Sequence, residues 1–243
     1  MKFNILGSSS GIAEKGKNLS SVYVNAGEVH LIIDAGEGLA HSVQAENLDH
    51  ELLDAVIITH YHPDHVTGLF MLVQSLYIQK RERKLRIFLP ERVEEFCRMF
   101  TFFYTFPERL SFELDFQNIQ NISQVYPFIE ICENDHLAQY SDFIKENSYP
   151  NPMKCFSVRL NAEGRSLVYT SDIKKISSIQ SIIAKTDVCI VDAIHPDIDE
   201  IHSLDLSVKN RIILTHGSSV VTDQFVKENP KFVYAEENKI FTV

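Results

Sequence analysis

The chain has 243 residues, of which 44% are hydrophobic, and a formal net charge of −10. This length and apolar content are typical of a globular protein with a large core, and we expect a single domain over residues 1–243. The negative charge argues against extended nucleic-acid binding, because such binding depends on Lys and Arg neutralising many phosphates.

The first predicted elements are strands, since each is a short apolar run rich in β-branched residues. They are expected at residues 3–6, 21–24, 29–34 and 55–58. A turn around Gly27 joins the second strand to the third. The third strand ends at Asp34, and the fourth runs directly into a polar loop.

This loop, Thr59–His65, contains three histidines and one aspartate. Pro63 is expected to keep it from beginning an ordinary helix. Side chains two residues apart in extended backbone point the same way, so His60 and His62 are placed to bind one ion, with Asp64 and His65 aimed at a second. Imidazole suits zinc, iron or manganese, and the carboxylate favours the harder ions. The alternative is a histidine-rich surface loop that binds no metal.

The middle of the chain is predicted to continue with a helix at residues 67–80, a strand at 85–89 and a helix at 91–100. Residues 80–86 carry five cations, which form either a solvated turn or a docking patch for an anionic substrate.

A variable segment around residues 90–125 is rich in aromatic side chains. They are Phe96, Phe100, Phe102, Phe103, Tyr104, Phe106, Phe112 and Phe116. Exposed aromatic patches of this size are uncommon, so we expect the segment to pack on the core or on a subunit partner in a homodimer. The alternative is a lid over the metal cleft, and the two interpretations are compatible in a dimer.

The second half of the chain is predicted to be mainly strands, at residues 127–132, 156–160, 166–170, 188–192 and 211–215, with a helix at 174–184. Polar residues that can bind metal follow three of these strands. They are Asp172, His195 and His216.

Taken together, the motifs resemble those of the metallo-β-lactamase superfamily, in its ribonuclease Z and phosphodiesterase branch. His60-x-His62-x-Asp64-His65 is similar to the signature of that superfamily, and residues 6–11, 18–21 and 32–38 resemble the opening of the branch. Residues 167–172 resemble its strand that ends in a metal-bridging aspartate, and residues 212–218 resemble its last strand. The resemblance implies an α/β fold, a four-layer αββα sandwich of two facing mixed β-sheets with outer helices.

The resemblance also implies one or two divalent transition metal ions, zinc or manganese first and iron as an alternative. The ligands it implies are His60, His62 and Asp172 at one position, and Asp64, His65 and His216 at the other, with Asp172 as the bridge. Asp34 would orient a ligand histidine, and Asp64 would also help to remove a proton from the attacking water. Ser218 would contact a substrate oxyanion or cap the next helix.

One metal-ligand histidine of the ribonuclease Z and phosphodiesterase branch is replaced in this chain. Relatives carry a histidine before the bridging aspartate, followed by proline, and Asn151 stands at that place, before Pro152. An amide carbonyl is a weak, neutral ligand. Either this metal position is weak or vacant, or His136 or His195 supplies the ligand, and Asn151 contacts the metal or the substrate.

The sequence gives no signal for export. The N-terminus lacks the apolar core of a signal peptide, and no run approaches the length that spans a membrane. The cysteines, Cys97, Cys132, Cys155 and Cys189, have no paired spacing, so we expect reduced, buried thiols. We therefore expect a cytoplasmic protein without membrane partners.

The function implied by the resemblance is hydrolysis by a metal-activated water. A phosphodiester is the favoured substrate, as a small cyclic phosphate, a nucleotide or an RNA-type molecule. With nine glycines and eight prolines we expect no long arm of the kind that grips tRNA, so tRNA processing ranks below the other phosphodiester reactions. The alternatives are an ester or lactone hydrolase of the same fold and a diverged, non-catalytic binding or regulatory module.

Overall fold

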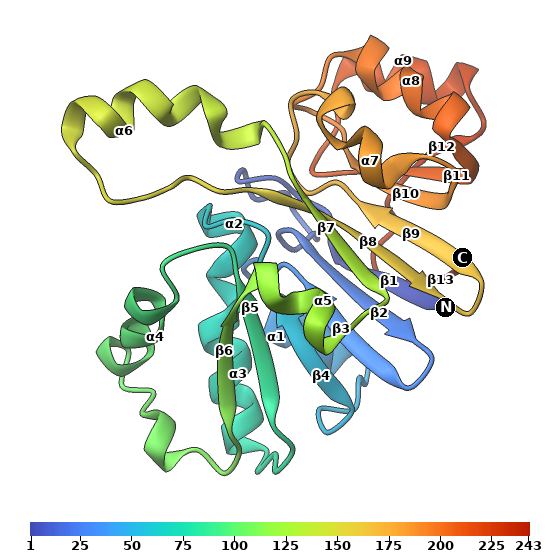
Figure 1. Cartoon of the computed structure of the whole chain (residues 1–243). Coiled ribbons are helices and arrows are strands. Elements are labelled where there is room, and N and C mark those ends of the chain that lie inside the picture. The colour runs from blue at the N-terminus through green and yellow to red at the C-terminus, as the bar shows by residue number, and fades with distance from the viewer. The chain divides into compact units, whose positions relative to one another are not determined.

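The computed structural model describes residues 1–243 and divides into two compact units (Figure 1). The first unit is Met1–Asn121 with Glu237–Thr242, and the second is Ile122–Glu236 with Val243. Each unit contains one mixed β-sheet with flanking helices. The α/β class and the two mixed sheets are therefore confirmed, whereas the single domain over residues 1–243 stays a prediction.

The first unit is built on a seven-stranded sheet in the order β13-β1-β2-β3-β4-β5-β6. Its strands are β1 (Lys2–Gly7), β2 (Ser21–Ala26), β3 (Val29–Ile33), β4 (Leu53–Ile57), β5 (Leu85–Leu89), β6 (Leu114–Asn118) and β13 (Ile240–Thr242). Its helices are α1 (Leu39–Ala45), α2 (Pro63–Val66), α3 (Gly68–Ile78), α4 (Val93–Phe102), η1 (Pro107–Arg109) and η2 (Ile119–Asn121). β3 to β6 are parallel neighbours, so the polar residues that follow β3 and β4 lie at the same edge of the sheet.

The second unit contains a six-stranded sheet in the order β12-β11-β10-β9-β8-β7. Its strands are β7 (Ile129–Glu133), β8 (Phe156–Ala162), β9 (Arg165–Tyr169), β10 (Thr186–Asp192), β11 (Val208–Thr215) and β12 (Phe232–Tyr234). Its helices are α5 (Ile122–Val125), η3 (His136–Tyr140), α6 (Ser141–Asn147), η4 (Ile176–Ile179), α7 (Gln180–Ile183), α8 (Ile198–Ser207) and α9 (Val220–Glu228). β9 to β12 are parallel, and again the candidate ligands follow the ends of these strands.

Apolar packing on these sheets holds the candidate ligands in place. In the first unit, Leu69, Leu72 and Leu76 of α3 belong to the same buried cluster as Val56 of β4. In the second unit, Ile201 of α8 and the isoleucines of η4 and α7 share a cluster with the strands. Burying each such side chain contributes about 1.5–3 kcal/mol, so the strand ends are rigid supports.

Every strand predicted from the sequence is present, with small shifts at the ends, and the predicted helices at 67–80 and 91–100 correspond to α3 and α4. Two expectations were wrong. Pro63 begins α2 as its first residue, because a proline there gives up only an N–H that has no partner within the helix. The predicted helix at 174–184 is instead the 3₁₀ turn η4 followed by the single turn α7, since Ile and Ser favour helix only weakly.

The basic segment at residues 80–86 is largely neutralised within the first unit. Arg81 is fully buried and donates to the carbonyl groups of Leu53 and Lys84. Arg83 pairs with Asp54 at 2.9 Å, and Lys84 pairs with Glu113 at 2.8 Å. These contacts argue against the docking patch, and the burial of Arg81 also departs from a fully solvated turn.

None of the four cysteines forms a disulfide; Cys155 and Cys189 are buried, and Cys97 and Cys132 are partly exposed. Burial raises the pKa of the Cys189 thiol well above its ordinary value, so this thiol stays protonated. No helix has the length and apolar character needed to cross a lipid bilayer.

Candidate metal centre

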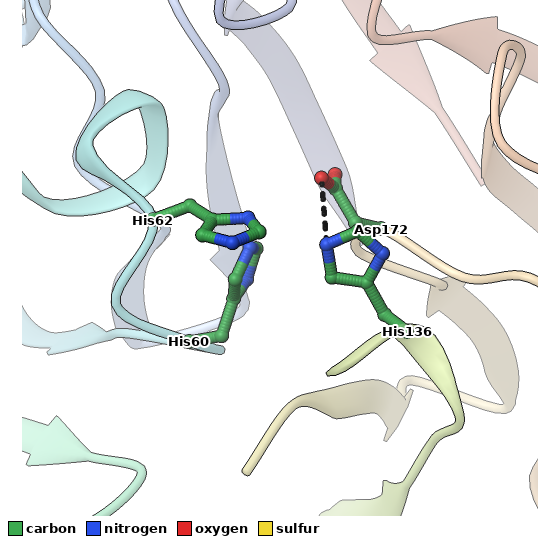
Figure 2. Close-up of side chains that lie close together, drawn as sticks. All are labelled: His60, His62, His136 and Asp172. Atoms are coloured by element: carbon green, nitrogen blue, oxygen red, sulfur yellow. Dashed lines mark ion pairs between the residues drawn. The ribbon is translucent and has the colours of Figure 1, made fainter. Parts of the chain in front are cut away.

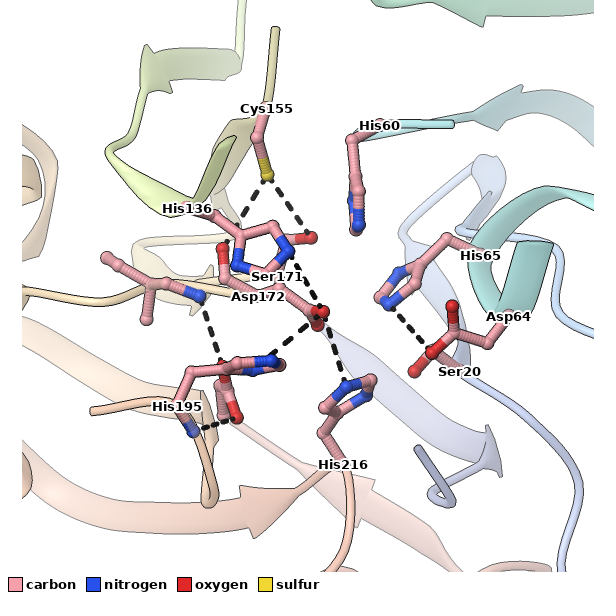
Figure 3. Close-up of polar contacts among 12 residues, drawn as sticks. Ser20, His60, Asp64, His65, His136, Cys155, Ser171, Asp172, His195 and His216 are labelled. Atoms are coloured by element: carbon pink, nitrogen blue, oxygen red, sulfur yellow. Dashed lines mark hydrogen bonds and ion pairs between the residues drawn. The ribbon is translucent and has the colours of Figure 1, made fainter. Parts of the chain in front are cut away.

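In the first unit, three imidazoles gather on the loop that follows β4. The His60 and His62 rings meet edge to face with their centres 4.8 Å apart (Figure 2). The centres of the His60 and His65 rings are 4.2 Å apart, and both side chains are fully buried. The Asp64 carboxylate lies 3.7 Å from Nε2 of His65 (Figure 3). The structure thus brings together all four predicted ligands of this loop.

Asp34 orients this cluster from the end of β3. Its carboxylate is fully buried and accepts a 2.7 Å hydrogen bond from Nδ1 of His65. It also accepts hydrogen bonds of 2.8 Å from the backbone N–H and the hydroxyl of Thr59. Because Nδ1 of His65 donates to Asp34, Nε2 is the nitrogen that can bind a metal. This is the contact expected for a group that orients a ligand histidine.

Tyr61 anchors the same loop between His60 and His62. Its ring stacks on Phe96 of α4 at 5.0 Å, and its hydroxyl donates a 2.7 Å hydrogen bond to the carbonyl of Glu91. Burial raises the pKa of the Tyr61 phenol far above its ordinary value, so the group stays neutral. One part of the aromatic segment therefore packs on the metal loop, whereas Phe102 and Tyr104 are exposed.

Glycine is required where the chain from β3 passes this loop. A Cβ on Gly36 would lie 2.5 Å from the carbonyl oxygen of Asp64. A Cβ on Gly68 would lie 2.0 Å from the carbonyl oxygen of Gly36. The backbone N–H of Ala35 donates to the carbonyl of His65 at 2.7 Å, so the close approach fixes the position of α2.

In the second unit, three imidazoles surround the carboxylate of Asp172, which follows β9. Its Oδ2 atom lies 3.2 Å from Nε2 of His216 and 3.5 Å from Nε2 of His136 (Figures 2 and 3). It lies 3.9 Å from Nδ1 of His195. The candidate ligand atoms of Asp172, His195 and His216 all lie within 4.8 Å of one another.

Asp192, which the sequence analysis did not single out, orients His195 as Asp34 orients His65. It is the last residue of β10, is 1% exposed, and accepts a 2.7 Å hydrogen bond from Nδ1 of His195. The same carboxylate accepts the backbone N–H of Ile173 at 3.1 Å. An aspartate ending a buried strand shortly before a histidine is the sequence signal that could have identified it.

Asn134 is a second residue that sequence reasoning missed. Its side-chain amide donates to the backbone carbonyl groups of Thr170 and Asp172 at 3.2 and 3.0 Å. Its side-chain oxygen accepts the backbone N–H of His136 at 3.1 Å. Asn134 therefore fastens the segment of His136 to the strand end that carries Asp172.

The structure also places the residues considered for the missing ligand. His136 is buried and lies beside Asp172, and His195 lies beside Asp172 as well. Asn151 lines a cavity with Ile144 of α6. Ser218 is exposed, and the capping of α9 is carried out by Ser219, whose hydroxyl accepts the N–H of Thr222.

Comparison with known families shows to which family the chain belongs. The model of the family described as anti-Pycsar protein Apyc1 matches residues 1–241. The chain belongs to the Apyc1 family. Ribonuclease Z of Pediococcus pentosaceus is 24% identical to this Apyc1-family chain over 237 residues, which cover 90% of the chain and 76% of that relative. Other ribonuclease Z relatives, at 31–32% identity, align over 29–32% of their length.

Solved structures show the fold of the Apyc1-family chain. The metallo-β-lactamase fold protein YhfI from Bacillus subtilis has a TM-score of 0.75 at 19% identity and covers 99% of this chain and 98% of its own. Human tRNase Z, short form, has a TM-score of 0.73 at 16% identity, with coverage of 100% and 99%. The chain has the metallo-β-lactamase fold, as its motifs implied, and its relatives support a metal-dependent hydrolase.

The donor sets of this Apyc1-family chain fit divalent metal ions. Imidazole nitrogen and carboxylate oxygen are the ligands of zinc, manganese and iron sites. Two ligands of one such ion lie up to about 4 Å apart, since each bond is about 2.0–2.2 Å long. The grouping of Asp172, His195 and His216 is already close to that spacing.

Proposed function

We propose that this chain is a metal-dependent phosphodiesterase that hydrolyses a small cyclic phosphate or a nucleotide. The observation that supports it most is the arrangement around Asp172, a buried carboxylate with His136, His195 and His216 beside it. Imidazole and carboxylate groups that lie this close together are suited to bind a metal ion. The relatives of the chain include ribonuclease Z.

The metal ligands that we propose come from both sets. His60, His62 and Asp172 serve one position, and Asp64, His65 and His216 serve the other, with Asp172 shared. His136 supplies the imidazole that Asn151 does not, because it lies 3.5 Å from the Asp172 carboxylate. Zinc or manganese, when bound, lowers the pKa of water to roughly 7 and neutralises charge on the phosphoryl oxygens.

The side chains around the ligands have separate tasks. Asp34 and Asp192 hold His65 and His195 through their Nδ1 atoms. Asp64 accepts a proton from the attacking water. His195 is 36% exposed, more than the other histidines around Asp172, and its Nδ1 is engaged by Asp192. Its Nε2 is therefore the nitrogen that we propose gives a proton to the leaving oxygen.

The chain's charge supports a small substrate. The net charge is −10, and Arg83 and Lys84 are paired within the first unit. An extended polynucleotide would need many unpaired cations along its path, whereas a single phosphodiester needs few. The absence of disulfides supports our proposal of a cytoplasmic location.

The decisive experiment compares Asp172→Asn with Asp199→Asn, a change of the same kind on the exposed surface of α8. Hydrolysis of bis(4-nitrophenyl) phosphate and of cyclic nucleotides is measured with added manganese or zinc. We expect Asp172→Asn to lose at least about a thousandfold in kcat/KM, because a shared ligand is removed, and Asp199→Asn to match the wild type. Turnover that persists in chelator, or faster turnover of lactones than of any phosphodiester, would contradict the proposal.

The structure weakens the argument for a module without turnover. That alternative depended on Asn151 leaving one metal position incomplete. His136 lies against Asp172 and provides an imidazole there, so the donor set does not lack a histidine.

A further inference from the structure

Residues 8–20 form a loop between β1 and β2 that has a buried base and an exposed tip. The loop begins with two buried serines, Ser8 and Ser9, whereas residues 11–17 are all exposed. The backbone N–H of Ser9 donates to the carbonyl of Asn18 at 3.0 Å and closes the base. The loop is therefore fixed where it leaves the sheet, and only its tip is open to solvent.

Both the tip and the base of this loop lie against Asp64. A Cβ placed on Gly11 in the tip would lie 3.5 Å from Oδ2 and 3.9 Å from Oδ1 of the Asp64 carboxylate. At the base, a Cβ on Gly36 would lie 2.5 Å from both the carbonyl oxygen of Asp64 and the carbonyl carbon of Leu19. The Asp64 side chain is 12% exposed, so its neighbours decide where the carboxylate lies.

The carboxylate of Glu237 joins the two ends of the loop. Glu237 lies where the chain returns to the first unit, in a bridge with Ile5 of β1. Its Oε1 atom accepts the backbone N–H and the hydroxyl of Ser8 at 2.8 and 2.9 Å. The backbone N–H of Asn18 donates to the same carboxylate, at 3.2 Å from Oε1 and 3.3 Å from Oε2. Hydrogen bonds to a charged acceptor are about twice as strong as neutral ones, so one side chain holds both ends.

The side chain of Asn18 fixes the second end of the loop to the rest of the first unit. Its amide donates to the hydroxyl of Ser42 in α1 at 2.7 Å and to the carbonyl of Leu6 at 3.3 Å. A Cβ on Gly38 would lie 2.1 Å from its side-chain oxygen, so the packing there leaves no space for a larger residue. The bonds to Glu237 therefore complete a base that is held on several sides.

We propose that Glu237 is a positioning residue for Asp64 and acts through this loop. With both ends of the loop joined, Gly11 stays beside the Asp64 carboxylate, and Leu19 stays packed on Gly36 beside the Asp64 backbone. The carboxylate then keeps one position. The inference rests on the proposed function, in which Asp64 binds a metal ion and accepts a proton from the attacking water.

The first test compares Glu237→Ala with Glu237→Gln. Loss of the carboxylate frees the ends of the loop, so we expect kcat for a cyclic nucleotide to fall about tenfold or more in Glu237→Ala. KM should stay within about twofold, because the loop holds Asp64 rather than the substrate. Glutamine keeps one acceptor oxygen and should recover part of the loss. Glu28→Ala, which changes an exposed glutamate in the turn between β2 and β3, is the matched control.

Limited digestion of the metal-loaded protein with trypsin measures the loop without turnover. Lys15 and Lys17 lie in the exposed tip, and cleavage after them requires the loop to open locally. We expect this cleavage to be about tenfold faster in Glu237→Ala, with cleavage after Lys185, an exposed residue of the second unit, unchanged. Competition with a coloured chelator should show a severalfold loss of metal affinity, since Asp64 is a proposed ligand.

Gly11→Val tests the contact at the tip and leaves Glu237 intact. The branched side chain would press on the Asp64 carboxylate, because its Cβ alone lies 3.5 Å away. We expect kcat and metal affinity to fall, while trypsin cleaves the tip at the wild-type rate. Ala13→Val, on the same exposed tip, is the matched control.

The outcomes separate this inference from the proposed function. If the wild type hydrolyses no phosphodiester while Glu237→Ala and Gly11→Val both lower metal affinity, the proposed function fails and the positioning role stands. Wild-type kcat and metal affinity in Gly11→Val, or in a Glu237→Ala protein whose loop is cleaved faster, would overturn the positioning role. Equally faster cleavage after Lys185 would show a general loss of stability and would overturn it as well.

Discussion

The two units position their imidazoles differently, although each uses a buried aspartate to orient one histidine. In the first unit, His60, His62 and His65 come from one loop after β4. In the second, the histidines come from three separate segments and meet at Asp172. In both, a buried aspartate at a strand end accepts Nδ1 of one histidine at 2.7 Å.

The units differ most in the exposure of the histidine that this aspartate holds. His65 is fully buried, whereas the His195 side chain is 36% exposed. A buried imidazole with a fixed nitrogen is suited to hold a metal, and a partly exposed one can also exchange protons with substrate and solvent. The same aspartate–histidine pair is therefore suited to two tasks, and substitutions in each unit can test this difference.

Among the substitutions that test this difference between the units, the largest effect is expected for His195→Gln. If His195 gives a proton to the leaving oxygen, kcat for a cyclic nucleotide should fall about a hundredfold or more. The loss should be much smaller for bis(4-nitrophenyl) phosphate, whose phenolate leaves without a proton. Equal losses with both substrates would show that His195 acts as a ligand or a support only.

The next largest effect is expected on metal affinity, in a comparison of Asp34→Ala with Asp192→Ala. We expect metal affinity to fall about a hundredfold for Asp34→Ala and about tenfold for Asp192→Ala, within the range for partners of ligand histidines. Asp34 also accepts hydrogen bonds from the backbone N–H and the hydroxyl of Thr59. Removal of the Asp34 carboxylate therefore leaves these buried donors unsatisfied as well as Nδ1 of His65. Competition with a coloured chelator measures both affinities. A larger loss for Asp192→Ala would reverse the assignment of tasks.

A smaller effect is expected for Asn134→Ala in the second unit. Its side chain ties His136 to the chain of Asp172, and without it both groups lose position. We expect metal affinity to fall severalfold and the free energy of unfolding to fall by about 1–3 kcal/mol. Chelator competition and urea unfolding measure these values. Asn229→Ala, which removes an amide bonded to Phe225, is the control for an asparagine remote from Asp172. Wild-type metal affinity in Asn134→Ala would refute its role.

The smallest effect is expected for Arg83→Gln in the basic segment. Arg83 is paired with Asp54, so it does not guide an anionic substrate, and exposed ion pairs contribute about 0–1 kcal/mol. We expect kcat/KM for a cyclic nucleotide to stay within about twofold of wild type at low salt. A tenfold loss that disappears at high salt would support the interpretation of residues 80–86 as a docking patch.

The sequence predicted the first ligand set better than the second, for a physical reason. His60, His62, Asp64 and His65 are neighbours in the chain, so spacing alone indicates a shared site. The sequence offered His136 only as one alternative for the missing ligand and did not single out Asp192, because both residues are far from Asp172 in the chain and motif likeness directed attention to Asn151. Strand β10 was predictable because it contains a continuous apolar, β-branched run, whereas β12 has three residues and α6 has no buried residue, so neither shows an apolar pattern.

The most direct test of the central claim is anomalous diffraction from a crystal soaked in manganese. Our account predicts two peaks per chain, with His60 and His62 bonded to one ion, His65 and His216 bonded to the other, and the Asp172 carboxylate at both. A single peak, peaks bonded only to residues of one unit, or no peak at these side chains would contradict it.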